Sequence, residues 1–274
     1  MDSIELAIES VALEKLMVDR WRNSIHTTSE DFVAVEIPVA IEYNGISHAV
    51  MLASPANLKD FALGFSLTEG IIQHLDEMYD CELVHQQNGI VVKTEISSKC
   101  FMELKSRRRN LTGRTGCGLC GVETIEQAVR YHQPVIHRNT VSEELLYQGM
   151  QRMQDLQPLH QSCGATHAAA WMNLDGQIIC VREDVGRHNA LDKLIGSLAY
   201  DGNDFSKGVA LITSRASFEM VQKCAAMGVG FLAAISAPTT LATQLAKDTG
   251  VTLVGYMREQ SYVTYAHPER IINT

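Results

Sequence analysis

The sequence VALITSRASFEMVQKCAAMGVGFLAAISAPTTLATQLAKDTGVTLVGYM runs from Val209 to Met257 and alternates short apolar runs with amphipathic stretches. The apolar runs 209–213, 231–236 and 251–257 have the length of strands, while 217–227 and 239–249 have helical spacing. Strands that alternate with helices in this way predict a largely parallel sheet. This stretch therefore places the chain in the α/β class.

A hairpin and two helices are predicted just before this alternation. The runs 168–173 and 177–182 flank Asp175-Gly176, a dipeptide that favours a tight hairpin turn, and residues 184–198 have helical spacing. An amphipathic helix is expected over residues 140–156, opened by the capping box Thr140-x-x-Glu143. We therefore expect an α/β domain that spans residues 136–274 and binds a cofactor.

The first half of the chain predicts a different organisation. Residues 37–43 and 46–52 alternate around Asn44-Gly45, the favoured type I′ turn, and the runs 81–84 and 90–96 repeat the pattern around Asn88-Gly89. Helical spacing marks residues 57–72 and 98–110. We expect an N-terminal α+β lobe over residues 1–135, with a cysteine-containing loop at its end.

Composition and charge exclude several classes of protein. Hydrophobic residues make up 46% of the chain and charged residues 20%, which excludes a disordered or collagen-like chain. The net charge is −9 and the pI about 5.6, the wrong sign for a broad surface that binds nucleic acid or anionic lipid. We therefore expect no nucleic-acid or membrane partner, and any anionic ligand must be bound by a local site.

The sequence also predicts a cytoplasmic location. The longest largely apolar stretch, 224–237, is shorter than the ~20 residues that a membrane-spanning helix needs. The first residues, MDSIELAIES, are acidic where a secretory signal would be positively charged. The seven cysteines are an odd number, and five of them stand singly, as expected of free thiols: Cys81, Cys100, Cys163, Cys180 and Cys224.

Two thiols at CxxC spacing lie in the glycine-rich loop Gly116-Cys-Gly-Leu-Cys-Gly121. Arg114 and the start of a helix expected over 122–131 favour the thiolate forms of Cys117 and Cys120. Four interpretations stay open: a persulfide carrier, a thioredoxin-like dithiol, half of a zinc site and a chance pair. A zinc ribbon needs a second cysteine pair, which the sequence lacks, and a thioredoxin motif directly follows a strand. The loop therefore favours sulfur transfer or redox chemistry.

Two strand-to-helix junctions in the α/β domain suit a phosphate. They cover residues 213–217 and 236–240, at the carboxyl ends of strands expected to be neighbours, where backbone N–H groups and hydroxyls of helix N-termini gather. Ordinary N-capping explains either junction alone equally well. The candidate ligand-binding residues are Ser214, Arg215, Ser217, Ser236 and Thr239.

A third polar cluster, Arg182-Glu-Asp-Val-Gly-Arg-His-Asn189, lies where a strand meets a helix. Asp184 is suited to cap that helix, but the density of charged and amide groups favours the wall of a site. His167 begins an apolar strand and is interpreted as a hydrogen-bonded histidine of the core.

The α/β half resembles the cytidine-deaminase layout without its zinc signature. No His-x-Glu opens the helix expected at residue 184, and no Pro-Cys-x-x-Cys opens the helix at residue 217. A deaminase mechanism therefore has no metal here, and we expect no structural metal.

A more specific resemblance rests on seven strings that occur in order along the chain. They are Gly45-Ile-Ser-His48, Ala62-Leu-Gly-Phe65, Glu69-Gly-Ile-Ile72, Gly113-Arg-Thr-Gly-Cys-Gly-Leu-Cys-Gly121, Thr166-His-Ala-Ala-Ala-Trp171, Glu183-Asp-Val-Gly-Arg-His-Asn-Ala-Leu-Asp-Lys193 and Ser214-Arg-Ala-Ser-Phe-Glu-Met220. Together they resemble the formate dehydrogenase accessory sulfurtransferase family, FdhD/NarQ, from about residue 36 to 270.

The resemblance implies a cytoplasmic sulfur carrier. Such a protein takes sulfur from a cysteine desulfurase and delivers it to the bis(molybdopterin guanine dinucleotide) molybdenum cofactor, its bound substrate, before that cofactor enters apo-formate dehydrogenase. In the family the first loop cysteine carries the persulfide, which corresponds to Cys117, with Cys120 as the assisting thiol. The resemblance also implies a homodimer, and a free guanine nucleotide as a partial mimic of the substrate.

The family's guanine dinucleotide segment follows the last strand and here corresponds to Tyr256, Met257, Arg258, Glu259, Gln260 and Ser261. It departs from a more basic, glycine-containing family pattern, although Arg258 keeps one positive charge for a phosphate. The alternative function is a non-catalytic chaperone that binds the cofactor and docks on apo-formate dehydrogenase. A third hypothesis is a dithiol reductase that cycles a disulfide between Cys117 and Cys120.

Overall fold

The computed structural model describes residues 11–112, 135, 139–258 and 261–273. Its largest sheet has the strand order β13-β12-β11-β10-β8-β9, with β10 (Gly208–Ile212), β11 (Phe231–Ala234) and β12 (Thr252–Arg258) parallel to one another. The other three strands pair antiparallel: β8 (His167–Asn173), β9 (Ile178–Asp184) and β13 (Ser261–Ala266). The predicted α/β class is confirmed.

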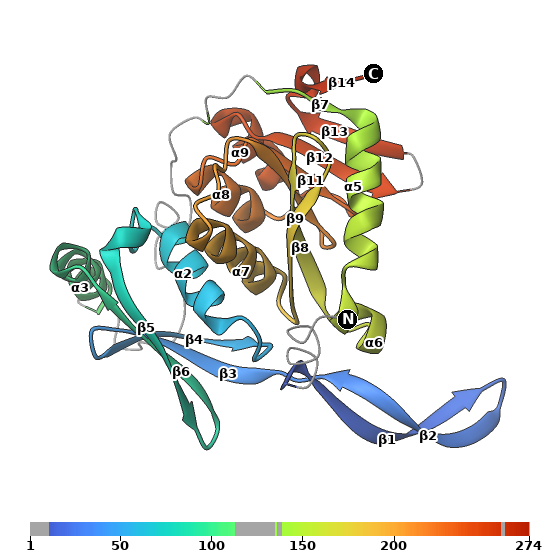
Figure 1. The fold of residues 1–274 in the computed structure, drawn as a ribbon, viewed down its shortest axis with the longest axis horizontal. Helices are drawn as coiled ribbons and strands as arrows, with labels where there is room; N and C mark the ends of the chain where they lie inside the picture. The colour runs from blue at the N-terminus through green and yellow to red at the C-terminus, as the bar shows by residue number, and fades with distance from the viewer. Residues whose placement is uncertain (1–10, 113–134, 136–138, 259–260, 274) are drawn as a thin grey trace.

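Helices cover both faces of this sheet (Figure 1). On one face lie α7 (Arg187–Tyr200), α8 (Phe218–Ala226) and α9 (Thr240–Thr249), and on the other lies α5 (Glu143–Asp155), followed by the short α6 (Pro158–Cys163). Strand β10 is buried along its whole length, which explains its continuous apolar sequence. The short strands β7 (Val141–Ser142) and β14 (Ile271–Ile272) pair parallel, and η2 (Pro268–Arg270) precedes β14.

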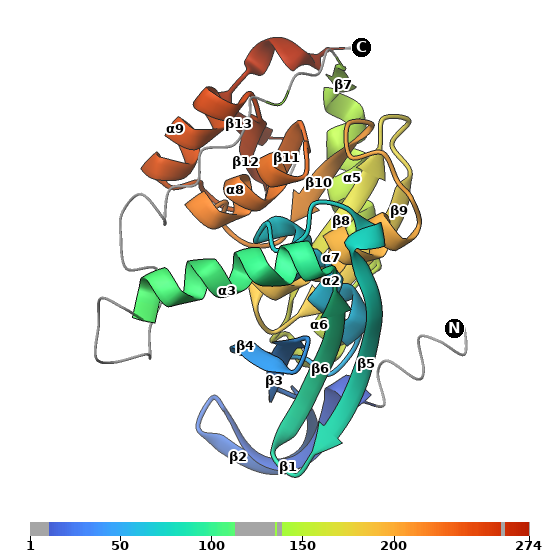
Figure 2. The same cartoon turned by 90° about the vertical axis from the view of Figure 1, so that its left-hand side faces the viewer.

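A second sheet has the order β4-β3-β6-β5. It consists of β3 (Ile37–Tyr43), β4 (Ile46–Ala53), β5 (Met78–Gln86) and β6 (Gly89–Ile96). Asn44 and Gly45 have φ angles of 45° and 80°, as a type I′ turn requires. Three helices accompany this sheet: α2 (Leu58–Thr68), η1 (Leu75–Glu77) and α3 (Ser98–Thr112). Both views show α2 and α7 between the two sheets (Figure 2).

The structure corrects two sequence expectations and adds one feature that the sequence did not predict. The arm formed by β1 (Leu13–Arg22) and β2 (Ile25–Ala34) was not predicted, because it projects from the body and no buried face imposes an alternating pattern (Figure 1). The expected capping box is wrong, since β7 takes residues 141–142 into pairing with β14 and α5 begins at Glu143, with Ser142 as its N-cap. The segment 256–261 does not follow the last strand, because β13 pairs with β12.

The α2 and α7 backbones touch through two glycines. A Cβ atom added to Gly64 would overlap the carbonyl oxygen of Asp192, and one added to Gly196 would overlap that of Asp60. A single hydrophobic cluster contains residues of both helices: Phe61 and Leu63 from α2, and Leu191 and Leu194 from α7. The N-terminal lobe therefore shares its core with the α/β domain, and the boundary near residue 136 stays a prediction.

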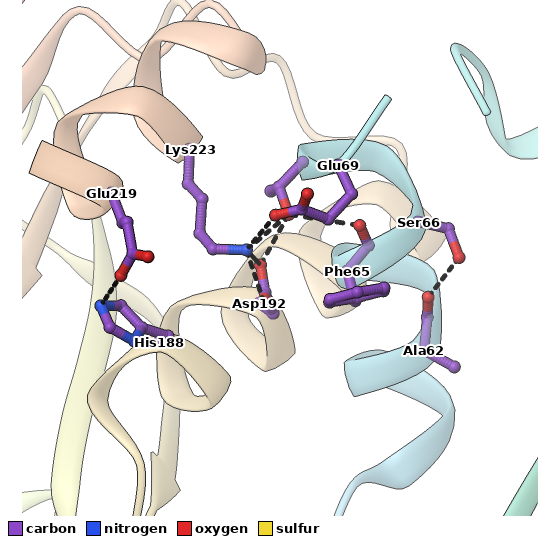
Figure 3. A network of polar contacts seen from close by, with 9 residues as sticks. Ala62, Phe65, Ser66, Glu69, His188, Asp192, Glu219 and Lys223 are labelled. Atoms are coloured by element: carbon purple, nitrogen blue, oxygen red, sulfur yellow. Dashed lines mark hydrogen bonds and ion pairs between the residues drawn. The ribbon is translucent and has the colours of Figure 1, made fainter. Parts of the chain in front are cut away.

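Buried ion pairs surround this crossing. Lys193 and Asp184 are fully buried, with Nζ and Oδ2 2.6 Å apart, and Lys193 also donates to the carbonyl oxygen of Ser54 at 3.0 Å. Lys223 of α8 pairs with Asp192 at 2.8 Å and with Glu69 at 3.4 Å (Figure 3). Each pair has further hydrogen-bond partners, which buried charges need to offset their loss of hydration.

The glycine crossing gives a first prediction. Gly64→Ala places a methyl group against the carbonyl oxygen of Asp192. Alanine favours a helix more than glycine does, but the cost of this overlap is larger. We expect the free energy of unfolding to fall by about 2 kcal/mol. Urea denaturation measures the change, with Lys59→Ala on the exposed side of α2 as the matched control. A Gly64→Ala protein as stable as the control would contradict direct backbone contact.

The buried pair gives a second prediction. Lys193→Met leaves the Asp184 carboxylate buried without its cation, which lowers the free energy of unfolding by about 3–5 kcal/mol. Lys207→Met removes the partner of Asp204 in an exposed pair and costs less than about 1 kcal/mol. Equal losses in the two variants, measured by urea denaturation, would show that Lys193 contributes no more than a surface charge.

Candidate functional site

The candidate ligand-binding residues gather at one edge of the six-stranded sheet, where β10, β11 and β12 end. Residues 214–217 follow β10, residues 236–239 follow β11, and Tyr256 lies near the end of β12. Backbone hydrogen bonds join the three segments: Thr239 N–H donates to Ala216 at 3.1 Å, and Tyr256 N–H donates to Ser236 at 3.3 Å. The two predicted junctions are neighbours, and ligand binding there stays a prediction.

The hydroxyl groups at the two junctions differ in what they do. Thr239 caps α9, because its Oγ1 accepts a hydrogen bond from Ala242 N–H at 3.3 Å. Ser217 is the N-cap residue of α8, but its buried Oγ has no partner within the described part of the chain. Ser214 is buried and donates to the Arg215 carbonyl at 3.1 Å, while the Arg215 side chain is exposed. Helix capping therefore explains the presence of a hydroxyl at Thr239 but not at Ser217.

The segment from Tyr256 to Ser261 contains an irregular stretch of β12. Tyr256 has a φ angle of 53°, unusual for a residue with a side chain, and is 46% exposed. Arg258 Nε donates to the Ile235 carbonyl at 3.0 Å, and Ser261 Oγ donates to the Arg258 carbonyl at 2.9 Å. Met257 is 1% exposed and lies in the hydrophobic core, so only its backbone faces this edge.

Four predicted site residues lie outside the described residues. They are the two loop thiols Cys117 and Cys120, and Glu259 and Gln260 of the nucleotide segment. The structure therefore brings together the sheet-edge candidates and says nothing of the thiols' placement.

The N-terminus of α7 adds basic groups to this edge. His188 Nε2 lies 2.6 Å from Glu219 Oε2 on α8, and this contact with His188 lowers the pKa of the Glu219 carboxyl (Figure 3). The buried Nε of Arg187 has no partner within the described residues. Asp184 is fully buried and accepts hydrogen bonds from Gly186 N–H at 2.8 Å and Asn189 Nδ2 at 2.9 Å, so it anchors the turn into α7 and does not itself line a site.

A pocket of about 530 Å³ lies beside this edge, on the side of α5 and α6. Its lining residues are Gln154, Gln157, His160, Gly164, Ala165, Thr166, His167, Thr213 and Ile235. His167, interpreted from the sequence as a core histidine, is only partly buried and lines this pocket. This pocket is not predicted from the sequence, because α6 and the sheet edge meet only in the folded chain. One sequence feature could have indicated it: if β8 pairs antiparallel with β10, then β8 begins at the edge where β10 ends, and His167 lies at that edge.

Two further observations concern only the described residues. They contain no group of three or more His, Cys, Asp or Glu side chains arranged to hold a metal ion. They also contain no helix that combines the length and the apolar character needed to cross a membrane.

Comparison with known proteins identifies relatives along most of the chain. The sequence model of the FdhD/NarQ family matches residues 34–272. The chain is 55% identical over 254 residues to the sulfur carrier protein FdhD of Cupriavidus necator. This alignment covers 93% of this chain and 88% of that protein. It is 56% identical over 244 residues to the protein of the same name from Bordetella petrii, covering 89% and 88%.

The fold has a counterpart among solved structures. A crystal structure of a putative formate dehydrogenase accessory protein from Desulfotalea psychrophila matches with a TM-score of 0.74, covering 95% of this chain and all of that one. The sequences are 23% identical, so this likeness concerns the fold alone.

The contrast between two hydroxyls gives a third prediction. Thr239→Ala removes the cap of α9 and lowers the free energy of unfolding by about 1 kcal/mol. Ser217→Ala removes a buried hydroxyl that has no hydrogen-bond partner among the described residues, so it changes the free energy of unfolding by less than about 0.5 kcal/mol. Thermal unfolding of both variants tests this, and an equal loss in Ser217→Ala would mean that its hydroxyl supports the fold.

Proposed function

The chain belongs to the FdhD/NarQ family, and we propose from that premise that it is a sulfur carrier that serves a formate dehydrogenase. Cys117 accepts sulfur from a cysteine desulfurase and passes it to the bis(molybdopterin guanine dinucleotide) molybdenum cofactor before that substrate enters apo-formate dehydrogenase. The observation that carries the proposal is the pair Cys117 and Cys120 in a glycine loop inside the matched region 34–272.

The transfer needs two thiol steps. The Cys117 thiolate attacks the outer sulfur of the desulfurase persulfide, so an S–S bond forms on Cys117 and the desulfurase cysteine leaves as a thiolate. In the second step the Cys120 thiolate attacks the inner sulfur of the Cys117 persulfide. This attack forms a disulfide between Cys117 and Cys120 and releases the outer sulfur as sulfide to the acceptor, and a cellular dithiol then reduces the disulfide.

The sheet edge supports binding of the substrate's guanine dinucleotide part. The N-termini of α7, α8 and α9 lie at this edge and present N–H groups that suit phosphate oxygens. Arg215 and Arg258 add positive charge to a chain whose net charge is −9. The proposed site is completed by the hydroxyls of Ser214, Ser217 and Ser236, and by Tyr256 and Ser261 near the end of β12. Thr239 contributes through α9, the helix that it caps.

The proposal also names partners and location. The partners are a cysteine desulfurase, apo-formate dehydrogenase and a second copy of the chain, and the location is the cytoplasm. The five cysteines among the described residues are free thiols, which suits a reducing compartment.

A persulfide measurement gives the fourth prediction. After incubation with a cysteine desulfurase and cysteine, the peptide that contains Cys117 gains one sulfur, about 32 Da, because its thiolate accepts sulfane sulfur. Cys117→Ala gains none and does not restore formate dehydrogenase activity in a complementation assay. Cys120→Ala, the matched control, still gains sulfur because it lacks only the releasing thiol.

Two other results would replace the proposal. A protein that takes up no sulfur while another acceptor is loaded in the same mixture acts as a cofactor-binding chaperone. Full complementation by Cys117→Ala would lead to the same conclusion.

A further inference from the structure

Helix α3 is a basic element in an acidic chain. Its 15 residues contain five cations and one anion, so the helix has a net charge of +4 while the whole chain has −9. The cations are Lys99, Lys105, Arg107, Arg108 and Arg109, and the anion is Glu103. Positive charge that is concentrated on one helix produces a local field that attracts an anionic partner, whatever the net charge of the protein.

The fold attaches α3 to the body at its first turns and again at Arg107. Cys100 is 4% exposed, and Phe101 and Leu104 pack partly against the main hydrophobic cluster. Further along the helix, Arg107 Nη1 donates a hydrogen bond to the carbonyl oxygen of Gly70 at 3.1 Å. Figure 2 shows the outer side of α3, with no other helix or strand in front of it. The helix is therefore held in place and presents its outer side to solvent.

The exposed side of α3 keeps its charge. Lys99 and Arg107 are exposed and lie about 12 Å apart along the helix axis. Within the described part of the chain, neither they nor Lys105 form a salt bridge, and Lys105 Nζ lies 4.2 Å from the centre of the Phe101 ring. Met102 is 59% exposed and adds apolar surface on the side of Lys99, three residues away. Unpaired cations beside an exposed methionine suit contact with another protein.

The place of α3 in the sequence indicates which partner uses this surface. The helix ends at Thr112, and Cys117 follows five residues later. Covalent geometry alone keeps Cys117 within roughly 18 Å of Thr112. A protein that binds along α3 can therefore bring its own persulfide to Cys117. The proposed site of the substrate lies elsewhere, at the edge of the six-stranded sheet, so α3 is left for the protein that supplies the sulfur.

We propose that α3 is the docking surface for the sulfur donor, which presents an acidic patch to Lys99, Lys105 and Arg107. The inference rests on the proposed function, because it takes a cysteine desulfurase as the donor that loads Cys117. An acidic protein surface fits this helix better than nucleic acid does, since the rest of the chain is strongly negative and repels a long polyanion. Charges at such an interface act mainly on the rate of association, and salt screens them.

Charge reversal on the full chain tests the proposal. Lys99→Glu and the double variant Lys99→Glu/Arg107→Glu are incubated with a cysteine desulfurase and cysteine, and mass spectrometry follows the gain of sulfur at Cys117. At about 50 mM salt we expect the second-order rate constant of loading to fall about threefold in the single variant and about tenfold in the double variant. At about 500 mM salt both differences shrink to less than about twofold. Lys247→Glu, at an exposed lysine in the last turn of α9, is the matched control and leaves the rate unchanged.

A small sulfur donor separates docking from chemistry. The Cys117 thiolate attacks the outer sulfur of glutathione persulfide, so an S–S bond forms on Cys117 and glutathione leaves as a thiolate. This donor needs no docking surface. Both α3 variants are expected to load from it within about twofold of the wild-type rate, which also shows that they fold and keep a reactive Cys117.

The outcomes separate this inference from the proposed function. If both donors load the wild-type protein, and the desulfurase loads the α3 variants at the wild-type rate, the inference is overturned while the proposed function stands. Loss of binding to a 20-nucleotide poly(U) RNA by those same variants would then assign the helix to nucleic acid. Equal slowing with both donors also overturns the inference, because the helix then acts on the reactivity of Cys117. If neither donor loads the wild-type protein, or glutathione persulfide alone does, the inference and the proposed transfer from a desulfurase are both overturned.

Discussion

The direct contact between the α2 and α7 backbones is the constraint on which the rest of the structure depends. Gly64 and Gly196 each lie against a carbonyl of the other helix, so no side chain separates the two axes. This contact joins the four-stranded lobe to the six-stranded sheet in one core. Because α7 begins at the edge of that sheet, its contact with α2 also helps to position Arg187 and His188 at this edge.

The buried charges depend on the crossing too. Asp184, at the end of β9, forms an ion pair with Lys193 and accepts a hydrogen bond from the backbone N–H of Ser54. Lys193 in turn donates to the Ser54 carbonyl, so β9, α7 and the segment after β4 meet at one carboxylate. Asp192 and Lys223 link α7 to α8, with Thr68 of α2 donating to the same carboxylate. Such pairs tolerate burial only while all their partners keep their places, so they couple the two lobes in position.

The two sides of the sheet edge differ in the side chains that they present. Helix N-termini, hydroxyls and the exposed Arg215 lie on the side of α8 and α9 and suit phosphates. The imidazoles of His160 and His167 lie on the side of α6, in a wall that hydrogen bonds to Glu183 hold in place.

Features that arise from a local pattern of residues can be predicted from the sequence. The alternation over residues 209–257 identifies the α/β class, and Asn44-Gly45 determines a turn. The spacing of Cys117 and Cys120 predicts sulfur or redox chemistry, which stays a prediction. Features that depend on contacts between distant segments appear only in the folded chain. Gly64 and Gly196 look in the sequence like ordinary helical glycines, each unfavourable by about 1 kcal/mol, and only the crossing explains them. The arm of β1 and β2 has no buried face and so no periodic pattern. His160 and His167 line one pocket because Glu183 draws α6 to the sheet edge. The periodicity of apolar residues shows which face of a helix or strand is buried. A binding site forms where several helices and strands meet, and packing in the folded chain determines which of them come into contact.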